Sequence, residues 1–256
     1  MSARFHIDLE LSPGASLVLP ANASRHVQVL RLQPGAPITL FDGRGGEWAA
    51  EVLEMGRKSV TVRLLSHAPI EREAGCRVTL APGMPANERM DALVEKATEL
   101  GVAALQPLVC ERSVLRLAGE RAERKAAHWQ AIAVAACEQS GRNRVPPVGP
   151  AMTFREWLAR QAVDPTPTTR LLLSLDADAR GLIDTLTAVR VGVLAGAPAG
   201  GPVQVLSGPE GGLSPAEAAA ARAAGFLPVS LGARVLRADT APLALLAIVA
   251  ALENLA

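Results

Sequence analysis

Short apolar runs that alternate with polar positions dominate the chain between residues 16 and 68. In Val60–Leu64 every second side chain is apolar, which is typical of a strand with one buried face. Residues 42–46 contain three glycines and separate two such runs, so they predict a hairpin loop. Residues 23–30 have the spacing of a short helix. Together these features predict a compact β-barrel-like module of roughly 70 residues.

After Pro69 the hydrophobic period changes to that of helices, and helical stripes alternate with strand-like runs. In the segment 87–101 the apolar residues recur at the i, i+3, i+4, i+7 spacing of one helix face, Asn87 can cap the start, and Gly101 marks the end. This alternation predicts a mostly parallel sheet covered by helices. The expected strands are 76–80, 104–109, 203–206 and 229–231, and the expected helices begin near residues 87, 120, 153 and 214, with a last, buried apolar helix after residue 240.

Two helix starts have the sequence of a capping box. The Ser214 hydroxyl can accept from the third helical amide, Glu217 can reach back to the cap, and Pro215 sits where no backbone donor is needed. Thr153 and Glu156 have the same spacing. We expect helices to begin directly after Thr153 and Ser214.

The length of the chain indicates its number of domains, and its net charge limits how it could bind a nucleic acid. At 256 residues the chain is long for one domain, and the change of period near Pro69 predicts a domain of residues 1–72 and a second of residues 73–256. The formal net charge is only +1. A nucleic-acid partner would therefore have to be bound by a local basic patch.

Metal sites and membrane segments are not expected. The three cysteines lie far apart and have no histidines at zinc-ligand spacing. The first residues lack the apolar core of a secretory leader, and the longest apolar run, 242–252, is too short to cross a bilayer. We therefore expect a soluble cytoplasmic protein whose cysteines are reduced and buried.

Two glycine-bearing loops, 207–213 and 232–240, follow expected strands and precede expected helices. Open parallel sheets place their ligands at this end of the strands, and glycine lets the backbone approach a ligand closely. Neither loop has the spacing of a Rossmann or P-loop nucleotide site. The residues alone leave two alternatives open: a ligand site built from backbone groups, or simple tight turns.

The sequence of these loops resembles one family of enzymes. Residues 206–214 read LSGPEGGLS and residues 229–242 read VSLGARVLRADTAP, and both resemble the RsmE family of the SPOUT superfamily. That family comprises bacterial methyltransferases that modify N3 of one uridine in 16S ribosomal RNA. Upstream segments resemble it in the same order: His26–Arg31, Phe41–Gly43, Glu88–Gly101, Cys110–Ser113 and Trp129–Arg142.

The resemblance implies a fold, an activity and a cofactor. It implies a trefoil-knotted α/β domain of the SPOUT type, an N-terminal PUA-like RNA-binding domain, and a homodimer with cofactor sites at the subunit interface. The cofactor would be S-adenosylmethionine, and the substrate 16S rRNA in the assembled small ribosomal subunit. The matching cofactor positions are Leu206, Gly208, Pro209, Glu210, Gly211 and Gly212 in the first loop and Leu231, Gly232, Val235, Leu236 and Arg237 in the second.

Two positions depart from the family pattern. The family usually has Arg-Thr-Glu-Thr before the last helix, whereas residues 237–240 here read RADT, so that Asp239 is one methylene shorter. The family also tends to have a lysine at the position of Ala86. We expect any contact that needs the reach of glutamate, and one RNA phosphate contact, to differ.

Methylation of N3 of uridine needs an in-line approach of the methyl group and removal of the proton from the nitrogen. Arg237 could stabilise negative charge on the uracil, or could form an ordinary ion pair. Glu138 or Glu210 could accept the proton, and each could equally be structural. Because the cofactor supplies the electrophile, no metal is required.

Several arginines are candidates for RNA phosphate contacts. Arg142 and Arg144 follow a long helix, where they could bind phosphate or neutralise the helix C-terminus. In the N-terminal module Arg25, Arg31 and Arg44 lie on or near loops, although acidic residues nearly balance them.

Two other functions remain open. One is a SPOUT methyltransferase that acts on another RNA, such as the ribose 2′-hydroxyl of a transfer RNA. The other is a non-catalytic RNA-binding ribosome-assembly factor, against which the intact glycine loops and Arg237 argue.

Overall fold

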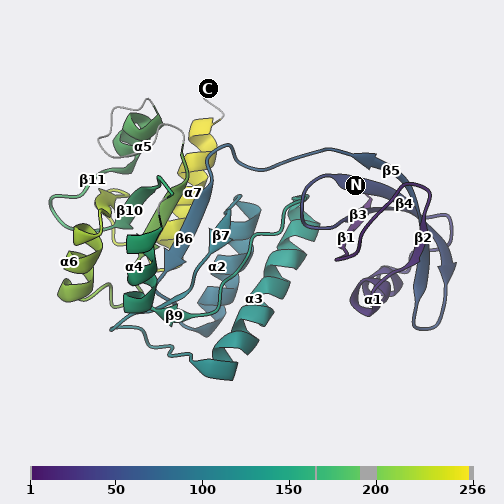
Figure 1. The fold of residues 1–256 in the computed structure, drawn as a ribbon, viewed down its shortest axis with the longest axis horizontal. Helices are drawn as coiled ribbons and strands as arrows, with labels where there is room; N and C mark the ends of the chain where they lie inside the picture. The colour runs from purple at the N-terminus through teal and green to yellow at the C-terminus, as the bar shows by residue number, and fades with distance from the viewer. Residues whose placement is uncertain (1, 165, 191–200, 254–256) are drawn as a thin grey trace. The chain divides into compact units, whose positions relative to one another are not determined.

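The computed structural model describes residues 2–164, 166–190 and 201–253 (Figure 1). The chain forms two compact units. The first contains Met1–Glu73 and Val134–Val145, and the second contains Ala74–Ala133 and Pro146–Ala256. The long helix α3 (Gly119–Ser140) therefore contributes its first part to the second unit and its last part to the first.

The first unit is built on a five-stranded sheet with the order β1-β3-β4-β5-β2. The strand β1 pairs with β3 in parallel, and the other neighbours are antiparallel. The expected hairpin is confirmed, because residues 42–46 join two antiparallel strands. The elements are β1 (Ala3–His6), β2 (Ser16–Val18), α1 (Ala21–Val29), β3 (Pro37–Phe41), β4 (Glu47–Met55) and β5 (Val60–Ala68).

The sheet buries one apolar face, as the alternating pattern predicts. Val60, Val62 and Leu64 on β5 are each at most 1% exposed, and Phe5 on β1 is fully buried. The strand β1 was not expected from the sequence. It has only four residues, and its pairing with β3 joins positions about 35 residues apart, which no local pattern encodes.

An ion-pair network joins the elements of the first unit. The carboxylate of Glu47 accepts from Arg4 at 2.7 Å, from Arg72 at 2.8 Å and from the Asn143 amide at 3.1 Å. The hydrogen bond from Arg72, reinforced by those from Arg4 and Asn143 and opposed by burial, lowers the pKa of Glu47 to about 2. Glu47 is therefore ionised at neutral pH and holds strand β4 to the segment after α3.

The second unit has a six-stranded sheet with the order β11-β13-β10-β12-β6-β7, and all of its pairings are parallel. The predicted parallel α/β architecture is thereby confirmed. A separate two-stranded ladder pairs β8 with β9. The strands are β6 (Val78–Pro82), β7 (Ala104–Leu105), β8 (Leu108–Val109), β9 (Met152–Thr153), β10 (Thr169–Leu173), β11 (Arg180–Gly181), β12 (Val203–Ser207) and β13 (Leu227–Ser230). The helices besides α3 are α2 (Asn87–Glu99), α4 (Phe154–Val163), α5 (Leu182–Arg190), α6 (Pro215–Ala223) and α7 (Thr240–Glu253).

Both predicted capping boxes form. Thr153 caps α4 and Ser214 caps α6, each with reciprocal bonds to the glutamate three residues later. The start of α2 differs from the prediction, because Ala86 occupies the N-cap position and Asn87 is the first helical residue. Alanine has no side-chain acceptor, so the exposed amides of this helix start need another partner.

The single strand expected over 104–109 is wrong. Two short strands form instead, separated by Gln106 and Pro107. Pro107 has no N–H to donate to the sheet, and after it the chain pairs with β9 rather than with β6.

The apolar helix α7 is only partly buried, which corrects the expectation of full burial. Leu245, Leu246 and Val249 are at most 5% exposed, but Ala247 and Ala251 are exposed and Ile248 is half-buried. Among the described residues, none of the helices has both the length and the apolar character needed to span a membrane.

Candidate functional site

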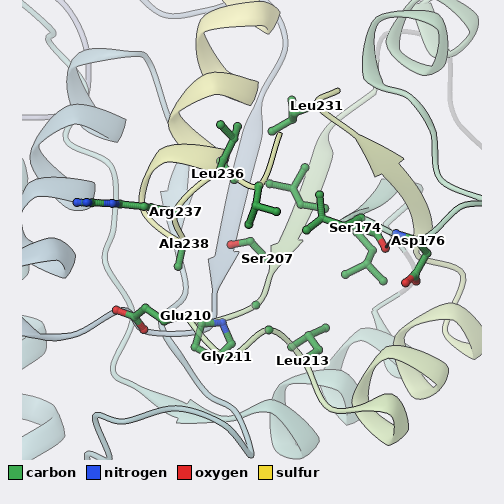
Figure 2. Close-up of a pocket in the computed structure, with 18 of the residues that line it drawn as sticks. Ser174, Asp176, Ser207, Glu210, Gly211, Leu213, Leu231, Leu236, Arg237 and Ala238 are labelled. Atoms are coloured by element: carbon green, nitrogen blue, oxygen red, sulfur yellow. Dashed lines mark hydrogen bonds between the residues drawn. The ribbon is translucent and has the colours of Figure 1, made fainter. Parts of the chain in front are cut away.

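A cavity of about 650 Å³ opens where strands β10, β12 and β13 end in the second unit. Its walls come from the loops that follow these three strands, so it lies at the carboxyl end of the parallel sheet, as expected for the two glycine loops. The volume is within the range of small-molecule sites. Figure 2 shows Ser207 at its centre, between Leu231 and Leu236 on one side and Glu210, Gly211 and Leu213 on the other.

The first loop, 208–212, folds closely on itself. A Cβ on Gly208 would lie 2.7 Å from the Leu213 amide nitrogen, so only glycine fits there. Gly212 has a φ of +67°, a conformation that glycine adopts without strain, and its N–H donates to the Pro209 carbonyl. The compact turn leaves backbone groups on the cavity wall.

Side chains from two other segments hold this loop. The Glu210 carboxylate accepts from the Ala86 N–H at 2.9 Å and lies 3.8 Å from the Arg89 guanidinium. The N-cap residue Ala86 has no side-chain acceptor, and the Glu210 carboxylate supplies an acceptor at the start of α2. On the other side Arg112 donates to the Gly211 carbonyl at 3.0 Å.

The second loop contributes an apolar wall and an arginine. Gly232 has a φ of +106°, and a Cβ there would meet nothing within 4 Å. Val235 is 80% exposed although it lines the cavity. The Arg237 side chain extends away from Ser207 in Figure 2, and it has no ion pair with any described residue.

Ten of the eleven expected cofactor positions line this cavity. The exception is Leu206, which is fully buried in the core of β12, one residue before the wall begins. The structure adds Ser174, Leu175 and Asp176, which follow β10 and were missed from the sequence. Their signal was the apolar run 171–173 directly before them, which is typical of a buried parallel strand.

The two candidate proton acceptors lie in different places. Glu210 lines the cavity. Glu138 belongs to the first unit, accepts from the His6 N–H at 2.9 Å, and lies 3.6 Å from the His26 ring. Arg237 and Glu210 therefore line the same cavity.

Asp239, where the family usually has glutamate, has an unusual environment in the structure. Its Oδ1 atom is buried and has no hydrogen-bond partner among the described residues. A longer glutamate would place its carboxylate elsewhere, so this position differs physically from the family pattern.

The arginines expected to contact RNA fall into two groups. Arg25, Arg31, Arg44 and Arg144 are exposed, and the last two pair with Asp8 and Glu71. Arg142 is only 3% exposed and pairs with Glu73. Arg142 is therefore a structural residue of the first unit and is not offered to a phosphate.

The cysteines do not contribute a nucleophile to the site. Burial raises the pKa of Cys110 and of Cys137 to about 12. Cys76 is half-buried rather than buried, which differs from the expectation. Within residues 2–164, 166–190 and 201–253, no group of three or more histidine, cysteine, aspartate or glutamate residues could hold a metal.

Comparisons with known proteins agree with this architecture. The model of an RNA methyltransferase domain matches residues 72–250, and the model of an RNA methyltransferase PUA domain matches residues 19–65. Ribosomal RNA small subunit methyltransferase E of Synechocystis is 36% identical over 88% of this chain and 69% of its own length.

Two solved structures have the same fold. A ribosomal RNA small subunit methyltransferase E from Neisseria gonorrhoeae, crystallised with S-adenosylmethionine, has a TM-score of 0.85 at 36% identity, over 100% of this chain and 98% of its own. A methyltransferase from Legionella pneumophila, also with its bound cofactor S-adenosylmethionine, has a TM-score of 0.87 at 32% identity, over 98% of each chain. These matches confirm the expected SPOUT-type fold with a PUA-like domain. The chain belongs to the ribosomal RNA small subunit methyltransferase E family.

Proposed function

We propose that this protein transfers the methyl group of S-adenosylmethionine to N3 of one uridine in 16S ribosomal RNA. The observation that carries the proposal is the cavity at the carboxyl end of the parallel sheet, walled by the two glycine loops. Two relatives with the same fold were crystallised with S-adenosylmethionine. The uridine N3 specificity comes from the resemblance of the loops to the RsmE family.

The residues of the cavity fit this cofactor. Leu231, Val235 and Leu236 offer an apolar surface suited to an adenine ring, and the loop backbones offer donors and acceptors to its edge. Space is open beside Gly212 and Gly232, where a Cβ would meet nothing within 4 Å. We propose that the ten lining positions of the two loops hold the cofactor and that Leu206 supports them from behind.

When bound, S-adenosylmethionine supplies an electrophilic methyl group, so the reaction needs no metal. The chain's own residues have to bind the base and take its N3 proton. Arg237 is exposed beside the cavity, and we propose that its positive charge stabilises the negative charge that the uracil acquires. Two carboxylates, Glu210 and Asp176, line the cavity, and Asp176 pairs with Arg222 at 2.7 Å. We propose that Glu210 accepts the proton.

The first domain, residues 1–72, is proposed to bind RNA through Arg25, Arg31 and Arg44, together with Arg144, which lies opposite Arg44. Arg44 and Arg144 are directly opposite each other in an antiparallel bridge, although they are 100 positions apart in the chain. Both are more than half exposed, at 75% and 55% of their side chains. The second domain, residues 73–256, is proposed to contain the reaction site.

We also propose a cytoplasmic homodimer that acts on the assembled small subunit. The observations in support are the exposed alanines of α7 and the 80% exposed Val235 at the cavity. Apolar groups that remain exposed beside a ligand site are readily covered by a second copy of the chain.

The proposal is tested by offering labelled S-adenosylmethionine and the purified protein three acceptors: assembled small subunits, free 16S rRNA and transfer RNA. We expect label in the ribosomal RNA. Label in transfer RNA alone would instead support a different SPOUT activity, and cofactor binding without transfer to any acceptor would support a non-catalytic assembly factor.

A further inference from the structure

A stripe of positive charge runs along the first part of α3, in the same unit as the cavity. It consists of Arg121, Arg124, Lys125 and His128, and is called the α3 basic stripe here. Spacings of three, four and seven residues place these side chains on one face of the helix. Arg121, Arg124 and His128 are exposed, and Lys125 is half-buried.

Positive charge exceeds negative charge in the segment around this stripe. Residues 112–128 contain five arginines and lysines and two glutamates, a local excess of three positive charges in a chain whose formal net charge is +1. The remaining residues are therefore slightly acidic. The stripe is a local basic patch of the kind that a nearly neutral protein needs to bind a polyanion.

The stripe is largely free of intramolecular ion pairs. Within the described part of the chain, no carboxylate forms a salt bridge with Arg121, Arg124 or Lys125, although Glu120 lies one turn before Arg124. Some exposed arginines elsewhere do have such a partner, as Arg144 has Glu71 and Arg63 has Glu51. Cations without a carboxylate partner have no intramolecular ion pair to break when an external anion binds them.

Three contacts fix the base of the stripe. Asp91 on α2 accepts from the Trp129 indole at 2.8 Å and lies 2.9 Å from the His128 ring. The Lys125 ammonium lies 6.0 Å from the centre of the Trp129 ring, within the range of a cation–π contact. The helix is thus anchored by its buried side while the arginines point outward.

The stripe is also connected to the cavity through the chain. Arg112, which donates to the Gly211 carbonyl on the cavity wall, lies a few residues before the start of α3. Arg116 follows it and donates to the Glu111 carbonyl. A nucleic-acid strand that reaches the cavity therefore finds further arginines on the segment that leads to the stripe.

We infer that the α3 basic stripe binds the phosphate backbone of the substrate RNA beside the nucleotide that enters the cavity. From Arg121 to His128 the helix rises about 10 Å, which corresponds to about three phosphates along one strand. The inference rests on the proposed function, and it assigns to the second domain an RNA contact that is separate from the arginines of the first domain. Arginine is suited to phosphate because its planar donors can bind two oxygens.

The test compares two double variants of the full-length protein. Arg121→Ala/Arg124→Ala removes two charges of the stripe, and Arg155→Ala/Arg160→Ala removes two exposed arginines of α4 in the same unit as a matched control. Binding of 16S rRNA and of small subunits is measured over a range of salt concentrations, together with cofactor affinity and transfer kinetics.

We expect the stripe variant to raise the Kd for RNA about fivefold or more near physiological salt and to lower the salt slope by about 1 per arginine. The KM for RNA should rise while kcat and the Kd for S-adenosylmethionine stay unchanged, and the α4 variant should resemble the unmodified protein. An unchanged RNA affinity and salt slope would overturn the inference.

Two further outcomes separate this inference from its rivals. Loss of binding to subunits with normal binding to free RNA would assign the stripe to a ribosomal protein and overturn it. If the unmodified protein transfers no methyl group, the proposed function fails, but the RNA-binding comparison still decides whether the stripe contacts RNA.

Discussion

The close approach of β6 to the first loop allows a sharp test of how the cavity is built. Gly83 follows β6, and its N–H donates to the Ser207 carbonyl at 2.7 Å. A Cβ at this position would lie 2.5 Å from Cδ and 2.6 Å from the nitrogen of Pro209, whereas ordinary contacts begin at 3.4 Å. In Gly83→Ala the loop therefore has to retreat by about 0.9 Å.

The size of the effect follows from this displacement. A shift of about 1 Å in a positioning element can lower catalysis by about a hundredfold. Overpacking of this kind also destabilises the fold by about 1–3 kcal/mol. We expect Gly83→Ala to bind S-adenosylmethionine at least about tenfold more weakly, a loss of about 1.4 kcal/mol, and to transfer methyl groups more slowly.

Calorimetric titration with S-adenosylmethionine and thermal unfolding measure the two effects separately. Gly181→Ala is the matched control, because its Cβ would meet only the flexible carboxylate end of Asp184 at 2.9 Å. The reasoning would be refuted if Gly83→Ala bound the cofactor as tightly as Gly181→Ala and unfolded at the same temperature.

Three further predictions follow from named contacts. Ser214→Ala removes the cap of α6 and should lower the free energy of unfolding by about 1 kcal/mol in urea titrations, whereas Ser214→Thr should retain most of it. Because the folded pKa of Glu47 is about 2 against 4.5 ordinarily, its pairing with Arg72 and Arg4 contributes stability that is complete above about pH 5. That contribution, about 3 kcal/mol, should disappear as the pH falls towards 2, and Glu47→Gln should unfold with a weaker pH dependence; an identical pH profile would contradict the network. Because the cofactor is proposed to contact the loop backbones, which Arg237→Ala retains, this variant should lower kcat by about a hundredfold or more with little change in the Kd of S-adenosylmethionine. An equal loss of both would show that the Arg237 side chain acts only in cofactor binding.

Local chemistry explains which parts of the fold were readable from the sequence. The capping boxes at Thr153 and Ser214 form as predicted, because each is completed within four residues. The strand before the first glycine loop was predicted at 203–206 and observed at Val203–Ser207. A knotted path, in contrast, is expected only from the family resemblance, since no hydrophobic periodicity encodes a knot.

Contacts between distant segments explain what was missed. Nothing near Glu138 in the sequence indicates that the backbone of His6 occupies its carboxylate. Arg142 looked like an exposed cation after a helix, but Glu73, from the far end of the first segment, buries it as an ion pair. The break of the 104–109 strand was signalled by Pro107 and could have been foreseen.

In the functional site, too, local features could be predicted from the sequence and contacts between distant segments could not. Most positions of the two glycine loops could be placed from their sequence, and ten of the eleven line the cavity. The third wall, Ser174–Asp176, depends on β10 pairing between β12 and β13, which is a property of the whole sheet. The basic stripe on α3 carries no motif, and its exposure depends on how the helix is anchored to Asp91 of α2.

The central claim is most directly tested by mapping the modified nucleotide. Small ribosomal subunits from cells that lack this enzyme are incubated with the purified protein and S-adenosylmethionine, and the RNA is digested and analysed by mass spectrometry. The account predicts N3-methyluridine at a single position of 16S rRNA. A methyl group on a ribose or on another base, or no modification of the RNA at all, would contradict it.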